Sequence, residues 1–250
     1  FKITRDIIKI TDIKYVRILE SGVGYIRLSE FRENTLAELN NALSILSKEG
    51  MQSLIIDLRN NPGGLLDVAV KVTGKFLPPN KLVAYTKSRQ KDQDLEFFSE
   101  DQNTNLNLPL VILINEGSAS GSEIVAGALQ DYKRAIIIGK KSFGKGSVQT
   151  VIPLNDGSAL RLTTSHYFTP SGKIIQGKGI TPDITVEDKK IPDNKVSETG
   201  LKNSDEIFDQ VQNMQQNDKP AKNDFNYKTD TQLMRAVEAL KAIEIYKQVK

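Results

Sequence analysis

The chain has 250 residues, of which 38% are hydrophobic, with 34 Lys and Arg residues against 31 Asp and Glu residues. This length and apolar content are enough for a globular domain with a sizeable core. The net charge of +3 is too small to favour nucleic acid or acidic lipid as a partner. The lack of cysteine excludes disulfides and thiolate nucleophiles, and with a single histidine it gives no basis for expecting a metal or another cofactor.

Strand and helix patterns alternate along the first 140 residues. Short apolar runs predict strands at 23–31, 53–58, 82–86, 110–115 and 134–139. Apolar residues at helical spacing predict helices from 35 to a stop at Gly50, from 66 to 77, and after residue 120. The letters TLAE at 35–38 match a capping box for the first helix. This order of elements predicts an α/β core.

The last third of the chain has a different pattern. Residues 148–153 and 159–168 alternate as strands around an Asn155-Asp156-Gly157 turn, which predicts a β extension on the core. Residues 187–229 are rich in polar side chains and are expected to form a linker or a surface wrap. A helix at 230–250 presents an apolar stripe, so we expect it to pack on the core.

Two turns after buried strands are candidate sites. The letters GSASGS at 117–122 separate a strand from a helix, and such a bend exposes a hydroxyl where free N–H groups favour an oxyanion. A plain helix N-cap is the more common explanation of such residues. The letters NNPGG at 60–64 end another strand, and their glycines could present N–H groups to a carbonyl, although a simple turn explains them equally well.

A serine nucleophile needs a base, and Lys145 is the best candidate. The one histidine, His166, lies in an alternating strand, where a packing or surface role is more common. Gly144 and Gly146 let the backbone at Lys145 approach a neighbour closely, and a buried lysine can be neutral near working pH. Gln149 could accept a hydrogen bond from the amine without adding a charge, although spacing alone favours a solvent-facing strand residue.

The letters GKKSFGK at 139–145 also match the start of a phosphate-binding loop, which would make the chain a nucleotide-binding protein. Gly146 stands where such a loop needs Ser or Thr for magnesium. The residues that follow have a strand pattern, whereas a phosphate-binding loop opens a helix. Both features argue against nucleotide binding.

Five ordered motifs make the chain similar to the carboxyl-terminal processing peptidases, also called tail-specific proteases. They are GYIRLSEF at 24–31, DLRNNPGG at 57–64, GSASGSEI at 117–124, FGKG at 143–146 with Gln149, and YFTPSG at 167–172 leading to GITPD at 179–183. The resemblance implies an α/β spiral of strand and helix units related to the ClpP and crotonase architecture, with the β extension and C-terminal helix added to it.

The resemblance also implies a serine endopeptidase that cleaves proteins near their C-terminal tails through an acyl-enzyme. The middle serine of the family's S-A-S-x-S-E motif corresponds to Ser120, the base to Lys145 and the supporting glutamine to Gln149. The oxyanion is expected to be held by the N–H groups of Gly121 and of the glycine pair, Gly63 or Gly64.

The same resemblance divides the chain. Residues 21–186 are expected to be the protease core and 1–20 the end of a PDZ domain with a linker, so a PDZ module is expected upstream. Two positions depart from the family pattern, because Gly121 stands where alanine is usual and Lys140 where an acidic residue is usual. The expected partner is a protein or peptide substrate with an unstructured C-terminus. Association with a second copy of the chain or with an adaptor protein is also possible under this resemblance. The expected location is periplasmic or secreted. A non-catalytic peptide-binding scaffold is the alternative.

Overall fold

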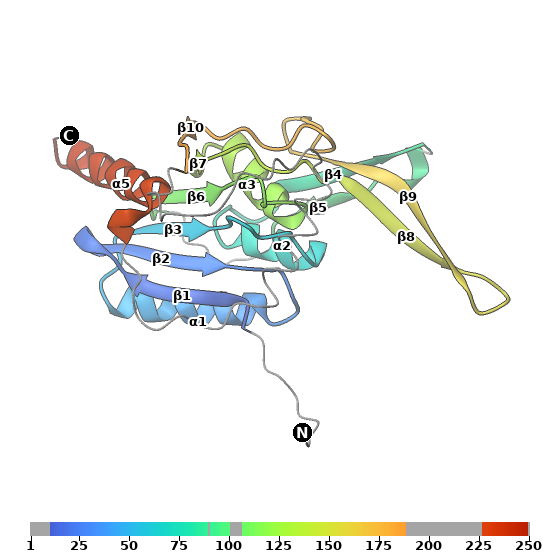
Figure 1. Cartoon of the computed structure of the whole chain (residues 1–250), viewed down its shortest axis with the longest axis horizontal. Coiled ribbons are helices and arrows are strands. Elements are labelled where there is room, and N and C mark those ends of the chain that lie inside the picture. The colour runs from blue at the N-terminus through green and yellow to red at the C-terminus, as the bar shows by residue number, and fades with distance from the viewer. Residues whose placement is uncertain (1–10, 90, 101–106, 189–226, 250) are drawn as a thin grey trace, which may run out of the picture.

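A six-stranded sheet forms the body of the protein in the computed structural model (Figure 1). The structure describes residues 11–89, 91–100, 107–188 and 227–249. Residues 1–10 of the predicted PDZ remnant and 189–226 of the predicted polar linker lie outside these ranges. The strand order is β1-β2-β3-β6-β7-β10, and every neighbouring pair is parallel except β1 with β2. The bounds are β1 Ile13–Ile18, β2 Val23–Leu28, β3 Ser53–Asp57, β6 Leu110–Ile114, β7 Ile136–Gly139 and β10 Ile184–Thr185.

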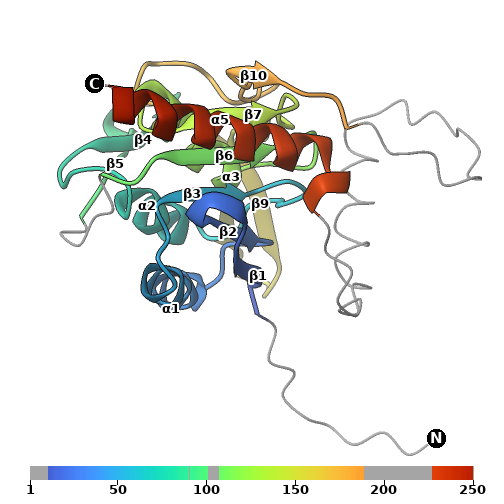
Figure 2. The same ribbon diagram turned by 90° about the vertical axis from the view of Figure 1, so that its left-hand side faces the viewer.

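Helices cover both faces of this sheet, which confirms the predicted α/β fold. Their bounds are α1 Thr35–Lys48, α2 Leu66–Gly74, α3 Gly121–Asp131 and α5 Thr231–Val249, with short 3-10 turns at Glu20–Gly22, Lys91–Gln93 and Tyr227–Thr229. Successive strand side chains point to opposite faces. On β3, Leu54 and Ile56 join the apolar cluster under α1, α2 and α3, whereas Ile55 joins a second cluster under α5. Figure 2 shows α5 beside β6 and β7 and remote from α1.

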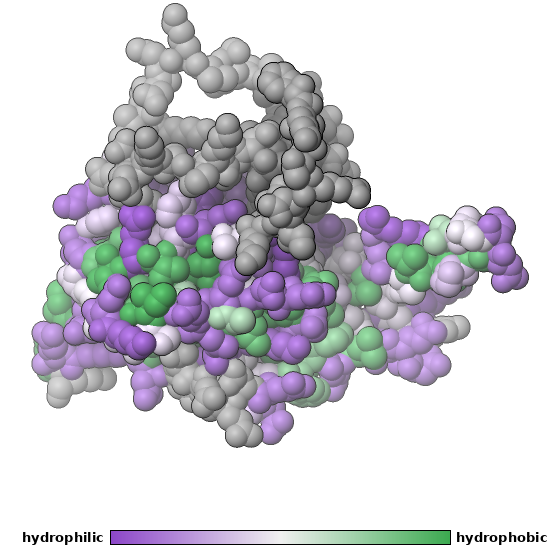
Figure 3. Space-filling view, turned by 90° about the horizontal axis from the view of Figure 1, so that it is seen from below, coloured by the Kyte–Doolittle hydropathy of each residue, from purple (hydrophilic) through white to green (hydrophobic). Residues whose placement is uncertain are grey.

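A second sheet, in the order β5-β4-β9-β8, carries the predicted β extension. Its strands are β4 Leu82–Ser88, β5 Glu96–Phe98, β8 Ser147–Pro153 and β9 Ala159–Phe168. The β8–β9 hairpin projects from the body as an arm, which stands out in Figures 1 and 3. Large apolar side chains are exposed along this arm, at Val151, Ile152, Leu154, Leu160 and Leu162. Only the base of the arm, next to β4, is buried.

Part of the segment predicted to be a domain end and a linker, residues 1–20, belongs to the main sheet. Strand β1 pairs with β2 along its length, so the main sheet begins at Ile13. Val16 and Ile18 pack against the main core and Tyr15 packs against the cluster under α5. No strand was predicted at 13–18, and the place of β1 in the sheet follows from its pairing with β2.

The capping box predicted at 35–38 is wrong. Glu38 Oε2 accepts hydrogen bonds from the backbone N–H groups of Asp12 (2.9 Å) and Ile13 (3.1 Å). Thr35 Oγ1 donates to Asp12 Oδ2 at 2.6 Å. The two side chains therefore tie α1 to the start of β1 instead of capping the helix. Within the described residues, no helix has both the length and the apolar character needed to cross a bilayer.

Candidate active site

Ser120 lies at the turn between β6 and α3, where it is the N-cap residue of the helix. Its backbone has φ 53° and ψ −112°, a combination that residues with a side chain rarely adopt. Ser120 is half-buried, whereas Ala119 and Gly121 on either side of it are buried. A serine held in this way on a sharp strand-to-helix turn presents its hydroxyl at the N-terminus of the helix.

Asn61, which is fully buried, joins two turns. One is the glycine-pair turn at 60–64, and the other, at 117–122, carries the candidate nucleophile Ser120 and is called the nucleophile turn below. Its carbonyl oxygen accepts hydrogen bonds from Ala119 N at 3.0 Å and from Ser122 Oγ at 2.9 Å. A Cβ added at Gly63 would lie 2.8 Å from Ser120 Cβ, and φ at this glycine is 102°. The backbone of Gly63 therefore contacts the nucleophile turn directly, and only glycine fits there.

The N–H groups of the two glycines have different environments. Gly63 N donates to Asn61 Oδ1 at 2.9 Å. No acceptor for the Gly64 N–H lies among the described residues. Gly121 is the first residue of α3, and the first N–H groups of a helix have no partner within the helix. Of the three glycines predicted to hold an oxyanion, Gly64 and Gly121 thus have an N–H available and Gly63 does not.

The loop that carries Lys145 lies against the nucleophile turn. Phe143 N donates to Ser118 O at 3.0 Å, and Gly177 N donates to Gly144 O at 2.8 Å. A Cβ added at Gly146 would lie 2.5 Å from the backbone nitrogen of Gln176. The predicted reason for the flanking glycines, close backbone approach, is confirmed.

Glu123, in the first turn of α3, connects the two loops and was not singled out from the sequence. Its side chain is fully buried, and Oε2 accepts from Ser120 N and from Lys145 N, each at 2.8 Å. Oε1 accepts from Ser142 Oγ at 2.6 Å and from Gly144 N at 2.7 Å. The three backbone N–H groups among these partners can only donate, so their bonds favour the ionised carboxylate, whereas its burial favours the protonated form. The S-A-S-x-S-E motif contains this residue, and its spacing of three from Ser120 was the available signal.

The model of peptidase family S41 matches residues 22–186. The chain belongs to peptidase family S41. It is 50% identical over 190 residues to the "Carboxy-terminal-processing protease" of Bartonella bacilliformis, which covers 74% of this chain and 43% of that protein. It is 39% identical over 207 residues to a "Probable CtpA-like serine protease" of Staphylococcus epidermidis, with 80% of this chain and 42% of that protein covered.

Among solved structures, the S41 chain is similar to the photosystem II D1 C-terminal processing protease. The TM-score is 0.65 at 34% sequence identity, and the match covers 76% of this chain and 52% of the other. The S41 chain spans less than half the length of the curated relatives named above.

The amine of Lys145 is a weaker base than an ordinary lysine in this S41 site. Burial lowers the pKa of Lys145 from 10.5, the positive charge of Arg161 lowers it further, and the carboxylate of Glu123 acts in the opposite direction. Burial raises the pKa of Glu123, and the hydrogen bonds from Ser142 and from three backbone N–H groups oppose that rise. The site therefore weakens the hold of the Lys145 amine on its proton, and it surrounds the buried carboxylate of Glu123 with hydrogen-bond donors.

Gln149 lies on β8, on the exposed arm, where Arg161 Nε donates to its Oε1 at 2.6 Å. The carbonyl that was predicted to accept from the amine of Lys145 is thus engaged by a cation of the neighbouring strand. His166 is half-buried in β9 and lies opposite Ser147 in the strand register. That position agrees with the packing or surface role favoured from its alternating strand.

The two departures from the family pattern have local explanations. Lys140 Nζ forms ion pairs with Glu116 Oε1 (2.6 Å) and Glu187 Oε2 (3.2 Å), so its charge is balanced within this S41 chain. A Cβ at Gly121 would lie 3.2 Å from Ala69 Cβ and 3.3 Å from Phe31 Cδ2. The packing around residue 121 is therefore tight for an alanine.

Proposed function

We propose that this chain is the catalytic core of a serine endopeptidase in which Ser120 is the nucleophile and Lys145 the general base. The observation that carries the proposal is the shared acceptor of the two loops. Ser120 N and Lys145 N both donate to Glu123 Oε2 at 2.8 Å, so the two backbones lie within twice that distance of each other. The strained turn at Ser120 and the lowered pKa of Lys145 support the same assignment.

The proposed reaction is acyl transfer. The neutral amine of Lys145 takes the proton of Ser120 Oγ as this oxygen bonds to a substrate carbonyl carbon, which gives a tetrahedral oxyanion. The resulting ammonium group returns the proton to the leaving amine as the peptide bond breaks. Water then attacks the acyl-enzyme, again with Lys145 as the base, and the new carboxyl end and free Ser120 are released.

Gly64 and Gly121 are the proposed oxyanion donors. Both have an available backbone N–H, and Gly63, whose own N–H is bound to Asn61, lies between them as the spacer in contact with Ser120. Fixed backbone dipoles of this kind stabilise a developing charge without rearranging, and removing one donor from such a site costs about a hundredfold or more in rate.

The proposed substrates are proteins with unstructured C-terminal tails, cleaved near that end. This follows from the names of the S41 relatives, which describe carboxy-terminal processing, at identities of 34% to 50%. For the full-length protein we propose a PDZ module upstream of β1 and a periplasmic or secreted location, with a homo-oligomer or an adaptor as further partners.

The test of the dyad is hydrolysis of a disordered protein followed by mass spectrometry of the fragments. Ser120→Ala and Lys145→Ala are each expected to abolish cleavage while the circular dichroism spectrum and the melting temperature stay close to those of the unmodified chain. Turnover retained in either variant would refute the assigned dyad. An unmodified chain that binds the protein but yields no fragments would identify a peptide-binding scaffold instead.

A further inference from the structure

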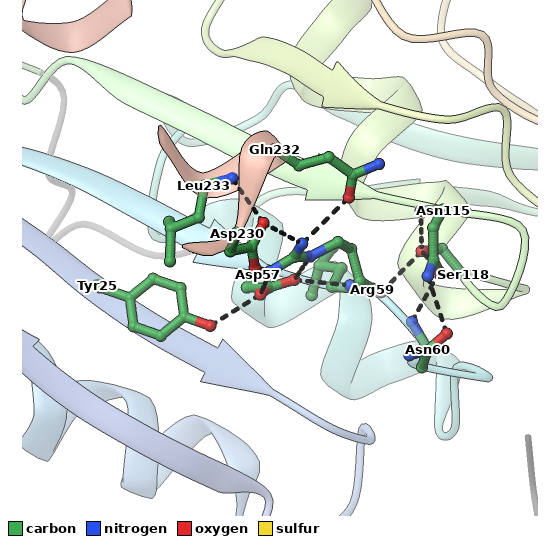
Figure 4. A network of polar contacts seen from close by, with 10 residues as sticks. Tyr25, Asp57, Arg59, Asn60, Asn115, Ser118, Asp230, Gln232 and Leu233 are labelled. Atoms are coloured by element: carbon green, nitrogen blue, oxygen red, sulfur yellow. Dashed lines mark hydrogen bonds and ion pairs between the residues drawn. The ribbon is translucent and has the colours of Figure 1, made fainter. Parts of the chain in front are cut away.

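A polar network joins the C-terminal helix to the strand that leads into the glycine-pair turn (Figure 4). Arg59 follows β3 and lies one residue before Asn60, the first residue of the turn. Its Nη1 donates to Asp230 Oδ1 at 2.9 Å, and its Nη2 donates to Asp230 Oδ2 at 2.6 Å. Asp230 is the residue before α5, and Arg59 is thus held in a two-bond, planar pairing of the kind that fixes orientation as well as distance.

The other side of the guanidinium is bound to Asp57, the last residue of β3. Nε and Nη2 of Arg59 donate to the two oxygens of Asp57 at 2.9 and 2.6 Å, and Tyr25 Oη donates to Asp57 Oδ2 at 2.8 Å. Burial alone would raise the pKa of Asp57, but the charge and hydrogen bonds of Arg59 outweigh it and the pKa is lowered. Asp57 is fully buried, and 12% of the Arg59 side chain is exposed.

One guanidinium therefore lies between two carboxylates, only one of which belongs to β3. Asp57 fixes Arg59 relative to its own strand, whereas Asp230 fixes it relative to α5, which packs on the face of the sheet opposite α1, α2 and α3. Because a buried or half-buried charge pair is costly to break by removing one partner, the network resists movement of Arg59.

Movement of Arg59 would be transmitted to the oxyanion glycines over a short path. Asn61, two residues later, holds Gly63 N through its side chain and receives both Ala119 N and Ser122 Oγ on its carbonyl oxygen. A displacement of this turn by a fraction of an ångström would misdirect the N–H of Gly64 relative to the oxyanion.

We propose that Asp230 is a positioning residue for catalysis, through which the C-terminal helix α5 holds the oxyanion turn at 60–64 in its active arrangement. The proposal rests on the proposed function, since it assigns a role within that active site. It deepens that function by making a helix on the far face of the sheet part of the catalytic apparatus, although no residue of α5 takes part in the chemistry.

Asp230→Ser is the selective test. Asp230 Oδ1 also accepts from Leu233 N at 2.9 Å, and serine caps a helix about as well as aspartate. Serine is too short to keep both bonds to Arg59, so the variant preserves the cap and removes the charged link. The bond from Arg59 Nη1 to Gln232 Oε1 on α5, at 3.1 Å, then remains as a neutral contact. We expect kcat on a disordered protein substrate to fall by about tenfold to a hundredfold with KM changed by less than about twofold, because an oxyanion contact acts in the transition state.

Two further variants calibrate this result. Asp230→Asn keeps the cap and one acceptor for Arg59, so its kcat is expected to lie between those of the serine variant and the unmodified chain. Glu238→Gln removes a negative charge from the same helix at an exposed pair with Arg235, where 59% of the Glu238 side chain is exposed. Its kcat should stay within about twofold of the unmodified chain, as expected for a surface pair. An unchanged kcat in Asp230→Ser, or an equal loss in Glu238→Gln, would overturn the proposal.

Backbone hydrogen exchange separates this proposal from the proposed function. In Asp230→Ser, amides of residues 60–65 are expected to exchange faster while those of β6 keep their protection, and Glu238→Gln should change neither. Faster exchange in β6 as well would mean general unfolding, and Asp230→Asn would then decide between the two explanations. If the unmodified chain cleaves nothing, the proposed function fails, but unchanged exchange at 60–65 in Asp230→Ser would still refute the coupling and faster exchange would support it.

Discussion

Ser120 combines a positive φ with a side chain, and this combination has a cost in stability. Its conformation is maintained by hydrogen bonds on both sides of the peptide, from Ser120 N to Glu123 Oε2 and from Glu123 N and Ile124 N to Ser120 O. The surrounding turn thus determines the backbone of Ser120, the candidate nucleophile, which lies where α3 begins. Such strain at a candidate nucleophile is the kind of feature that function retains and stability does not require.

The strain predicts that Ser120→Gly stabilises the fold while abolishing hydrolysis. Glycine adopts φ 53° and ψ −112° without the steric penalty, so the free energy of unfolding should rise by about 1 kcal/mol relative to Ser120→Ala. Urea unfolding of the two variants measures the difference. As a control, Ser47→Gly on the exposed side of α1 should lower stability. A glycine variant less stable than the alanine variant would contradict the strain argument.

At the scale of elements, α3 contributes to the site both through its N-terminus at Ser120 and through the side chain of Glu123. Glu123 extends from its first turn to the loop at 142–146, and the same carboxylate fixes the backbone of Ser120 and that of Lys145. The helix is therefore the element that brings two loops, 25 positions apart in the sequence, into one site. The two oxygens of the carboxylate together accept from four donors, one in the turn at Ser120 and three in the loop at 142–146.

Glu123→Gln is expected to damage both the fold and the activity. The amide has one acceptor oxygen, and its NH₂ group would face backbone N–H groups that cannot accept, so at least one buried donor loses its partner at a cost of about 1–3 kcal/mol. We expect a lower urea midpoint and a kcat reduced by about a hundredfold or more, because the turn that holds Ser120 is released. Glu116→Gln, on an exposed side chain that pairs with Lys140, is the matched control and should change neither quantity appreciably. Full activity in Glu123→Gln would show that the shared carboxylate is not needed.

At the scale of the whole molecule, the body and the arm meet at Lys145. The loop at 142–146 belongs to the body through Glu123, whereas β8 begins at Ser147 and continues into the arm, where Arg161 lies on β9. Burial in the body and the cation on the arm both lower the pKa of Lys145. The pKa of the proposed base therefore depends on how these two parts are placed.

The expected pH dependence follows from the direction of that shift. Lys145 accepts a proton only when neutral, so kcat/KM should rise with pH through the lowered pKa and level off below 10.5, the value of an ordinary lysine. Arg161→Gln removes one cause of the lowering, so the rising limb should move to higher pH. Lys71→Gln removes an equal charge from an exposed position on α2 and should leave the limb in place. If the rising limb of the pH profile lay at the same pH in Arg161→Gln as in the unmodified chain, the charge of Arg161 would not be lowering the pKa of Lys145, and the prediction would be wrong.

The sequence by itself determined most of the elements and several of the candidate site residues. Apolar runs and helical periods are local patterns, which is why β3, β6, α3 and the β8–β9 hairpin lie where they were expected. The motifs placed Ser120 and Lys145, and their glycine neighbours carry a local signal because close backbone contact permits no side chain.

The tertiary structure alone decided which of these residues act on one another. From the sequence, Glu123 looks like an ordinary acidic residue in the first turn of a helix. The groups that donate hydrogen bonds to it come from a loop about 20 positions away. Gly63 and Gly64 are alike in sequence and differ only because Asn61 takes the N–H of one. Asp230 lies 171 positions from Arg59, and no periodicity or motif connects them. Local patterns encode which conformation a segment adopts, whereas burial brings distant polar groups together and makes each require a partner.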